Sequence, residues 1–208
     1  MTKEQLQDVR ADIAFMRALA EQGSQAPLLG GGIIAAAGAI FGLASVIHWM
    51  IQSEILQVSP WFFMVNWIGA GAVFGIACTL LIRRARGQPG MQSAMNRATS
   101  SAWSAVGFSI FVTFLGMMAV AWTSKSDTVF YLFPVMILAL YGAAWTVAAD
   151  FTRKTWIRLV ALASFASAVL MGLLTNHPMQ MLAYAAALFF LAFVPGLILL
   201  RQEPSDTI

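Results

Sequence analysis

Apolar residues fill six long stretches of this chain, and short polar segments separate them. The stretches cover approximately residues 30–51, 61–82, 103–122, 130–149, 157–175 and 179–200. Each is about 19–22 residues long, and a helix that rises 1.5 Å per residue needs about 20 residues to cross a hydrocarbon core of about 30 Å. We therefore predict an all-α integral membrane protein with six transmembrane helices.

The composition supports this prediction. The chain is 60% hydrophobic and only 10% charged, which is outside the usual range of soluble globular domains. Its net charge of +3 does not indicate a nucleic-acid partner, because the basic residues are not clustered with aromatic residues on a soluble domain. The first apolar stretch follows a polar segment of about 27 residues, so we expect no cleavable signal peptide.

The basic residues alternate with the predicted spans and orient the chain. Eleven of the twelve Lys and Arg residues fall on one side of the membrane, and only Lys125 falls on the other. The eleven are Lys3, Arg10, Arg17, Arg83, Arg84, Arg86, Arg97, Arg153, Lys154, Arg158 and Arg201. By the positive-inside rule, both termini are predicted to be cytoplasmic, in a bacterial inner membrane. Arg83, Arg84 and Arg86, directly after the second span, are interpreted as lipid anchors.

The short connections predict three helical hairpins. A weak repeat agrees with this: Pro60, Pro134 and Pro178 stand near the start of the second helix of each hairpin, and an aromatic residue follows about two turns later. Proline is tolerated in the first turn of a helix because its missing N–H has no partner there. We divide the chain into residues 1–28, 29–201 and 202–208: an amphipathic cytoplasmic helix with its linker, the membrane domain and a short cytoplasmic tail.

The N-terminal segment has the pattern of an amphipathic helix. Thr2 and Gln5 form a capping box, and Gly23 is placed to end the helix. Its apolar stripe predicts a binding surface formed by Leu6, Val9, Ile13, Met16 and Leu19. Four acidic and three basic residues share the opposite face, unlike the basic face of a helix lying on anionic lipid. The stripe would therefore pack on this protein's own bundle, or on a cytoplasmic partner or a second copy, and a lipid surface is the remaining alternative.

Small residues mark candidate packing positions. Gly38 and Gly42 form a small-xxx-small pair in the first span, and Gly71 and Gly75 form another in the second. Such pairs allow close helix approach in lipid, so they predict either seams inside the bundle or a dimer interface. The oligomeric state is left open.

Few residues could carry chemistry. The predicted spans place no ionisable residue near the midplane, which argues against a proton-coupled pump. His48 and His177, both mapped to the outer side, are the candidates for haem or metal binding; the alternative is an interfacial histidine bonded to water or lipid. Asp150, near several basic residues, suggests a surface ion pair or a substrate gate. No motif for metal, phosphate or nucleophilic chemistry is present.

These patterns favour a non-enzymatic regulatory or interaction protein without a cofactor. The bundle would sense or bind a ligand from the membrane, and the N-terminal helix would contact a cytoplasmic protein. The alternative is a small permease or carrier of lipids or small molecules, and a third interpretation is a redox component that binds haem or a metal.

Overall fold

The structure, a computed structural model, describes residues 12–13, 28–85 and 93–203. These residues form helices and connecting turns and contain no strand. The elements beyond residue 28 are α2 (Gly31–Gln52), α3 (Phe62–Ala85), α4 (Ala94–Ser124), η1 (Thr128–Leu132), α5 (Phe133–Thr152), α6 (Thr155–Leu173), α7 (Gln180–Leu188), η2 (Phe189–Phe193) and α8 (Val194–Leu200). Of these, η1 is a 3₁₀-helix and η2 is a π-helix.

Six helices in the described residues are long and apolar enough to cross a membrane, which confirms the predicted number of spans. The protein is therefore a multi-pass membrane protein. The sixth span is made of α7, η2 and α8 together. The third span extends beyond the apolar stretch, because α4 begins at Ala94 and the side chain of Ser93 caps it by accepting from the Asn96 N–H at 3.2 Å.

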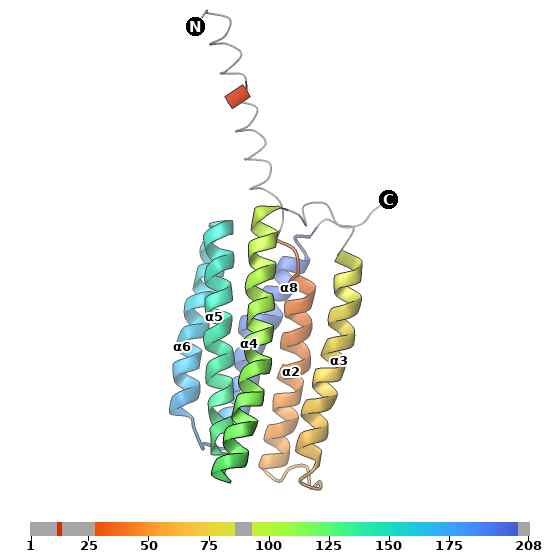
Figure 1. Ribbon diagram of the computed structural model, residues 1–208, viewed down its shortest axis with the longest axis vertical. Coiled ribbons are helices and arrows are strands. Elements are labelled where there is room, and N and C mark those ends of the chain that lie inside the picture. The colour runs from red at the N-terminus through yellow and green to blue at the C-terminus, as the bar shows by residue number, and fades with distance from the viewer. Residues whose placement is uncertain (1–11, 14–27, 86–92, 204–208) are drawn as a thin grey trace, which may run out of the picture.

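The helices run alternately up and down (Figure 1). The starts of α2, α4 and α6 and the ends of α3, α5 and α8 lie at one end of the bundle, which we call the terminal end. The opposite end is called the loop end. The arrangement agrees with the predicted hairpin connections.

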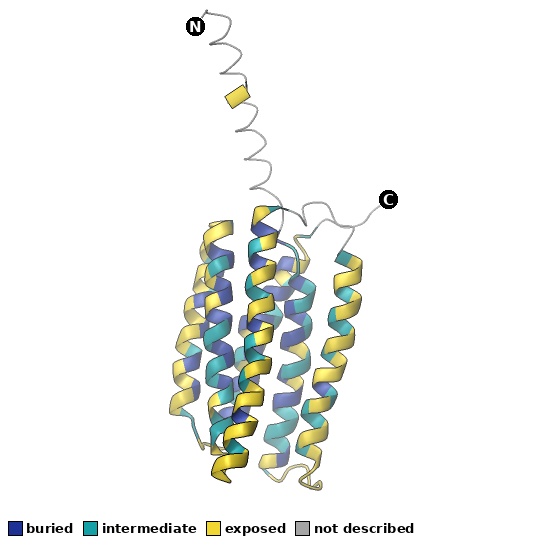
Figure 2. Cartoon of the chain, viewed as in Figure 1, coloured by how far each residue is buried: buried dark blue, intermediate teal, exposed yellow. Residues whose placement is uncertain are grey.

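The packing departs from three equivalent hairpins. The sixth span packs mainly along α2, while α6 packs mainly along α5. The core is formed mainly by α5, α6 and the sixth span, where Trp145, Ile157 and Ala192 are fully buried. By contrast, α3 packs mainly against α2, and Ala70 is its only buried residue among the residues described (Figure 2).

The fourth span consists of η1 followed by α5. Pro134 lies in the first turn of α5, directly after η1. The sixth span contains a π-helical segment, η2, and Pro195 follows it in the first turn of α8.

Candidate functional site

The backbones of α2 and the sixth span lie in close contact. A Cβ atom added to Gly38 would lie 2.8 Å from the Cα of Phe193, and one added to Gly31 would lie 2.7 Å from the carbonyl oxygen of Gly196. A Cβ on Gly196 would in turn lie 2.8 Å from the Cα of Ala35. These three glycines therefore allow the two backbones to touch, as small residues do in membrane helix pairs.

The π-helix is held by a buried indole. Within η2 the Val194 N–H donates to the carbonyl of Phe189, five residues earlier. The Trp145 Nε1–H of α5 donates to the Leu191 carbonyl at 3.0 Å, and the Trp145 side chain is 0% exposed. Because π-turns add a residue to a helical turn, they turn the following side chains and are frequent at functional sites. Pro195, four residues after Leu191, has no N–H to donate to this carbonyl, so the Trp145 indole supplies it with a donor.

An apolar groove runs along this contact, between α2 and the α7–η2 segment. It is a shallow, open groove with a volume of about 560 Å³. We call it the α2 groove, and its lining residues are Gly38, Ala39, Gly42, Leu43, Val46, Leu182, Ala185, Ala186, Phe189, Phe190 and Phe193. Leu43 is 62% and Phe190 is 64% exposed, so the groove opens to the outside of the bundle.

The side chains that line this groove can bind a ligand only through dispersion contacts. Its floor is glycine and alanine, and one wall is a set of three phenylalanines whose rings lie 5.1 Å (Phe189–Phe190) and 5.4 Å (Phe189–Phe193) apart. None of the lining side chains is charged or carries a hydrogen-bonding group. The groove can therefore hold an apolar chain, and its lining side chains supply no group for acid–base or nucleophilic catalysis.

Two remote side chains bind the backbone where the chain enters the bundle. The Leu29 N–H donates to Asn96 Oδ1 of α4 at 2.9 Å. The N–H groups of Gly30 and Gly31 donate to Glu203 Oε1, after α8, at 3.0 and 2.9 Å. Gly30 has φ +99°, a conformation that glycine adopts without strain, and it precedes the first turn of α2.

The two histidines lie in different local settings. At the loop end of α2, His48 Nδ1 accepts from Trp67 Nε1–H at 3.0 Å, and its ring lies 4.7 Å from that of Phe63. His177 lies in the α6–α7 turn, where its Nδ1 accepts from the Met179 N–H at 3.2 Å. In the described part of the chain, no three His, Cys, Asp or Glu side chains are grouped as a metal site would require.

The candidate packing glycines separate into two groups. Gly38 touches the sixth span as described, and Gly42 has room for a Cβ in ordinary contact, 3.8 Å from the Ala185 carbonyl oxygen. Around Gly71 and Gly75 the space is open, with nothing within 4 Å of an added Cβ. This pair therefore forms no seam with the helices that the structure describes, and the alternative, a dimer interface, stays a prediction.

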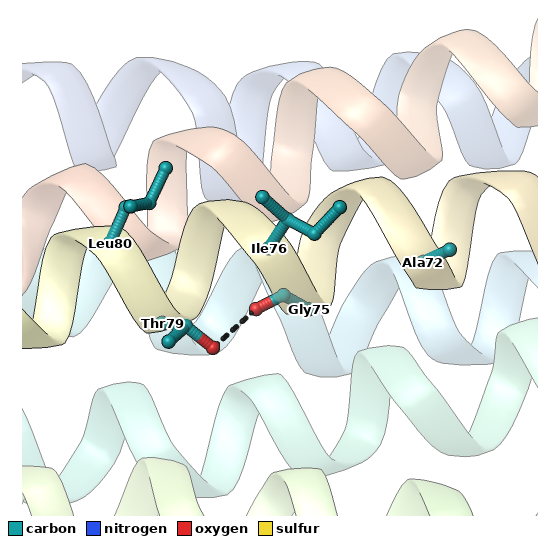
Figure 3. A pocket seen from close by; sticks show the side chains of 5 residues that line it. All are labelled: Ala72, Gly75, Ile76, Thr79 and Leu80. Carbon is teal, nitrogen blue, oxygen red and sulfur yellow. Dashed lines mark hydrogen bonds between the residues drawn. The ribbon is translucent and has the colours of Figure 1, made fainter.

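The space beside Gly75 forms a shallow hollow on α3 (Figure 3). Its volume is about 490 Å³, and Ala72, Gly75, Ile76, Thr79 and Leu80 line it. The Thr79 hydroxyl donates to the Gly75 carbonyl of its own helix at 2.8 Å, which satisfies the polar group locally (Figure 3).

The remaining predicted residues are placed only in part. Arg83 and Arg84 are exposed in the last turn of α3, and Arg86 lies outside the described residues. Ile13 is helical and 56% exposed. The other residues of the predicted partner surface, Leu6, Val9, Met16 and Leu19, lie outside the described part.

Sequence reasoning missed the residues that build the α2 groove and the contacts at the terminal end. The run Phe189-Phe190 and Phe193, closely followed by Pro195-Gly196, was a usable signal for an irregular segment in an otherwise regular span. Asn96 and Glu203 gave no such signal, because their partners lie 67 and at least 172 positions away. Comparison with known proteins finds no matching family model, no matching curated protein and no matching solved structure.

Proposed function

We propose that this protein is a non-enzymatic membrane protein with a regulatory or interaction role. Its bundle binds an apolar ligand of the membrane phase, a lipid chain, in the α2 groove, and its N-terminal helix contacts a cytoplasmic protein. The charge distribution supports a bacterial inner membrane with both termini in the cytoplasm.

The observation that carries this proposal is the position of α2. The helix that forms the floor of the groove, with Gly38 and Gly42, is also the helix that follows the N-terminal segment. Leu28, just before it, is only 4% exposed, so the start of this helix is packed into the bundle. A ligand that changes the α2 contact therefore acts on the helix to which the N-terminal segment is attached.

The groove is suited to a narrow, flexible occupant. The floor is made of small residues, but Leu43 and Phe190 stand at its edges with 62% and 64% of their surfaces exposed. A helix from another protein is about 10 Å wide, so the side chains at the edges would keep it from reaching the small residues of the floor. A lipid chain fits between the edge side chains. It comes from the bilayer and not from water, so dispersion contacts with the groove, and not the hydrophobic effect, would hold it there.

Lipid retention tests the proposal. Ala186→Phe would fill the groove from α7, while Ala72→Phe would place the same side chain in the hollow on α3. Native mass spectrometry of protein released from lipid nanodiscs would count the lipids that stay bound. We expect wild type and Ala72→Phe to retain a lipid that Ala186→Phe loses. Equal retention by all three proteins would contradict a lipid site in the groove.

A further inference from the structure

The C-terminal tail reaches the start of α2 through a pair of hydrogen bonds. After α8, the Gln202 and Glu203 N–H groups donate to the carbonyls of Leu199 and Leu200, at 2.9 and 3.3 Å, so the tail continues the helical turn. This turn places the Glu203 carboxylate on the N–H groups of Gly30 and Gly31. The first N–H groups of a helix have no partner within it, so an external acceptor is required.

The carboxylate suits this position electrostatically. The N-terminus of a helix carries a partial positive charge, and a hydrogen bond to a charged acceptor is stronger than one between neutral groups. The helix begins at once after this contact, because the Ile33 and Ile34 N–H groups donate to the Gly30 carbonyl at 3.1 and 3.3 Å. Glu203 therefore supplies the cap that the sequence beside α2 lacks, since Gly30 has no side chain to do so.

Two further contacts fix the same region from other helices. Lys154 Nζ, in the α5–α6 turn, donates to Gln202 Oε1 at 2.7 Å. Asn96 of α4 is 5% exposed and accepts from the Leu29 N–H. Two elements distant in sequence, α4 and the tail, thus converge on Leu29, Gly30 and Gly31. The α5–α6 turn in turn holds the tail, through the bond from Lys154 to Gln202.

From this convergence we infer that Arg201–Glu203 is a strap that fixes the start of α2 to the end of α8. When Glu203 is bonded to Gly30 and Gly31, the strap is closed. The start of α2, where the N-terminal segment joins the bundle, then moves together with the sixth span. Opening it would free the two amides of Gly30 and Gly31 and uncouple that point from the sixth span. The inference deepens the proposed function, because a signal from the groove would pass through this junction.

Amide hydrogen exchange of the full-length protein in nanodiscs tests the strap. In Glu203→Ala we expect the Gly30 and Gly31 amides to exchange at least about tenfold faster, since a hydrogen bond to a charged group is lost. Glu203→Gln keeps an acceptor oxygen and should give a smaller rise. The Leu29 amide, held by Asn96, should keep its rate in both variants.

A matched control uses another carboxylate. Asp127 precedes η1 at the loop end and makes no capping bond, so Asp127→Ala should change neither amide. Unchanged exchange at Gly30 and Gly31 in Glu203→Ala would overturn the strap. A uniform rise across α2 and α5 would also overturn it, because Glu203 would then support the whole bundle. The experiment needs no ligand or partner, so its failure leaves the lipid-retention result untouched.

Discussion

Adding one methyl group at Gly38 should weaken the packing of α2 against the sixth span. The new Cβ of Gly38→Ala would lie 2.8 Å from the Cα and 2.9 Å from the Cβ of Phe193. Main-chain atoms cannot move aside as a flexible side chain can, so the two helices must separate or the π-helix must shift. Overpacking of this kind costs about 1–3 kcal/mol.

Two glycines provide the reference for this cost. Replacing glycine by alanine inside a helix contributes up to about 1 kcal/mol of helix propensity, and this term is shared by all three positions. Gly42→Ala would make only ordinary contacts, 3.8 Å from the Ala185 carbonyl oxygen, and Gly71→Ala would meet nothing within 4 Å. The propensity term cancels in the comparison, so Gly38→Ala should be about 1–3 kcal/mol less stable than either control.

Thermal unfolding in one detergent, followed by tryptophan fluorescence, would measure the difference. For a chain of this length, about 1 kcal/mol shifts the Tm by roughly 2–4 °C. We expect Gly38→Ala to melt several degrees below Gly42→Ala and Gly71→Ala. If Gly38→Ala melted at the same temperature as Gly71→Ala, the close backbone contact between α2 and η2 would be refuted.

Three further predictions concern other parts of the chain. Trp145→Phe keeps a ring beside Trp103 but removes the donor to the Leu191 carbonyl, so unfolding should become easier by about 1–2 kcal/mol; an unchanged Tm would show that this bond does not hold η2. Asp150→Ala should change stability by less than about 1 kcal/mol, because both members of its 3.2 Å pair with Arg158 are 64% exposed, and a larger loss of stability in the same melting assay would contradict a simple surface pair. In a Cys78→Ala background, a cysteine at Ser126 should react with an impermeant thiol reagent from outside and one at Ser93 only from inside; the reverse pattern would overturn the orientation.

The spans were predictable from the sequence because hydropathy identifies segments that are apolar enough to lie in the hydrocarbon core. Any helix that crosses the hydrocarbon core needs about 20 apolar residues, whatever it packs against. Hydropathy does not, however, detect where a helix continues beyond its apolar segment. It places the third span at 103, while the structure begins α4 at Ala94, where the Ser93 cap and the absence of Gly or Pro over the next turns keep the chain helical.

The packing of the helices was less predictable. The pairs Gly38–Gly42 and Gly71–Gly75 have the same spacing, yet the first lies along the sixth span and the second faces open space. In lipid, both faces of a helix are apolar, so a small-residue pair shows that close approach is allowed but not which helix approaches. The contacts of Asn96 and Glu203 depend on the completed fold in the same way.

We have proposed that the N-terminal segment of this membrane protein contacts a cytoplasmic protein. A pull-down from native membranes in mild detergent, comparing full-length protein with a deletion of residues 1–22 by mass spectrometry, tests it most directly. The proposed function requires a soluble protein that only the full-length form retains. Identical sets of captured proteins from both forms, with the bundle folded in each, would contradict it.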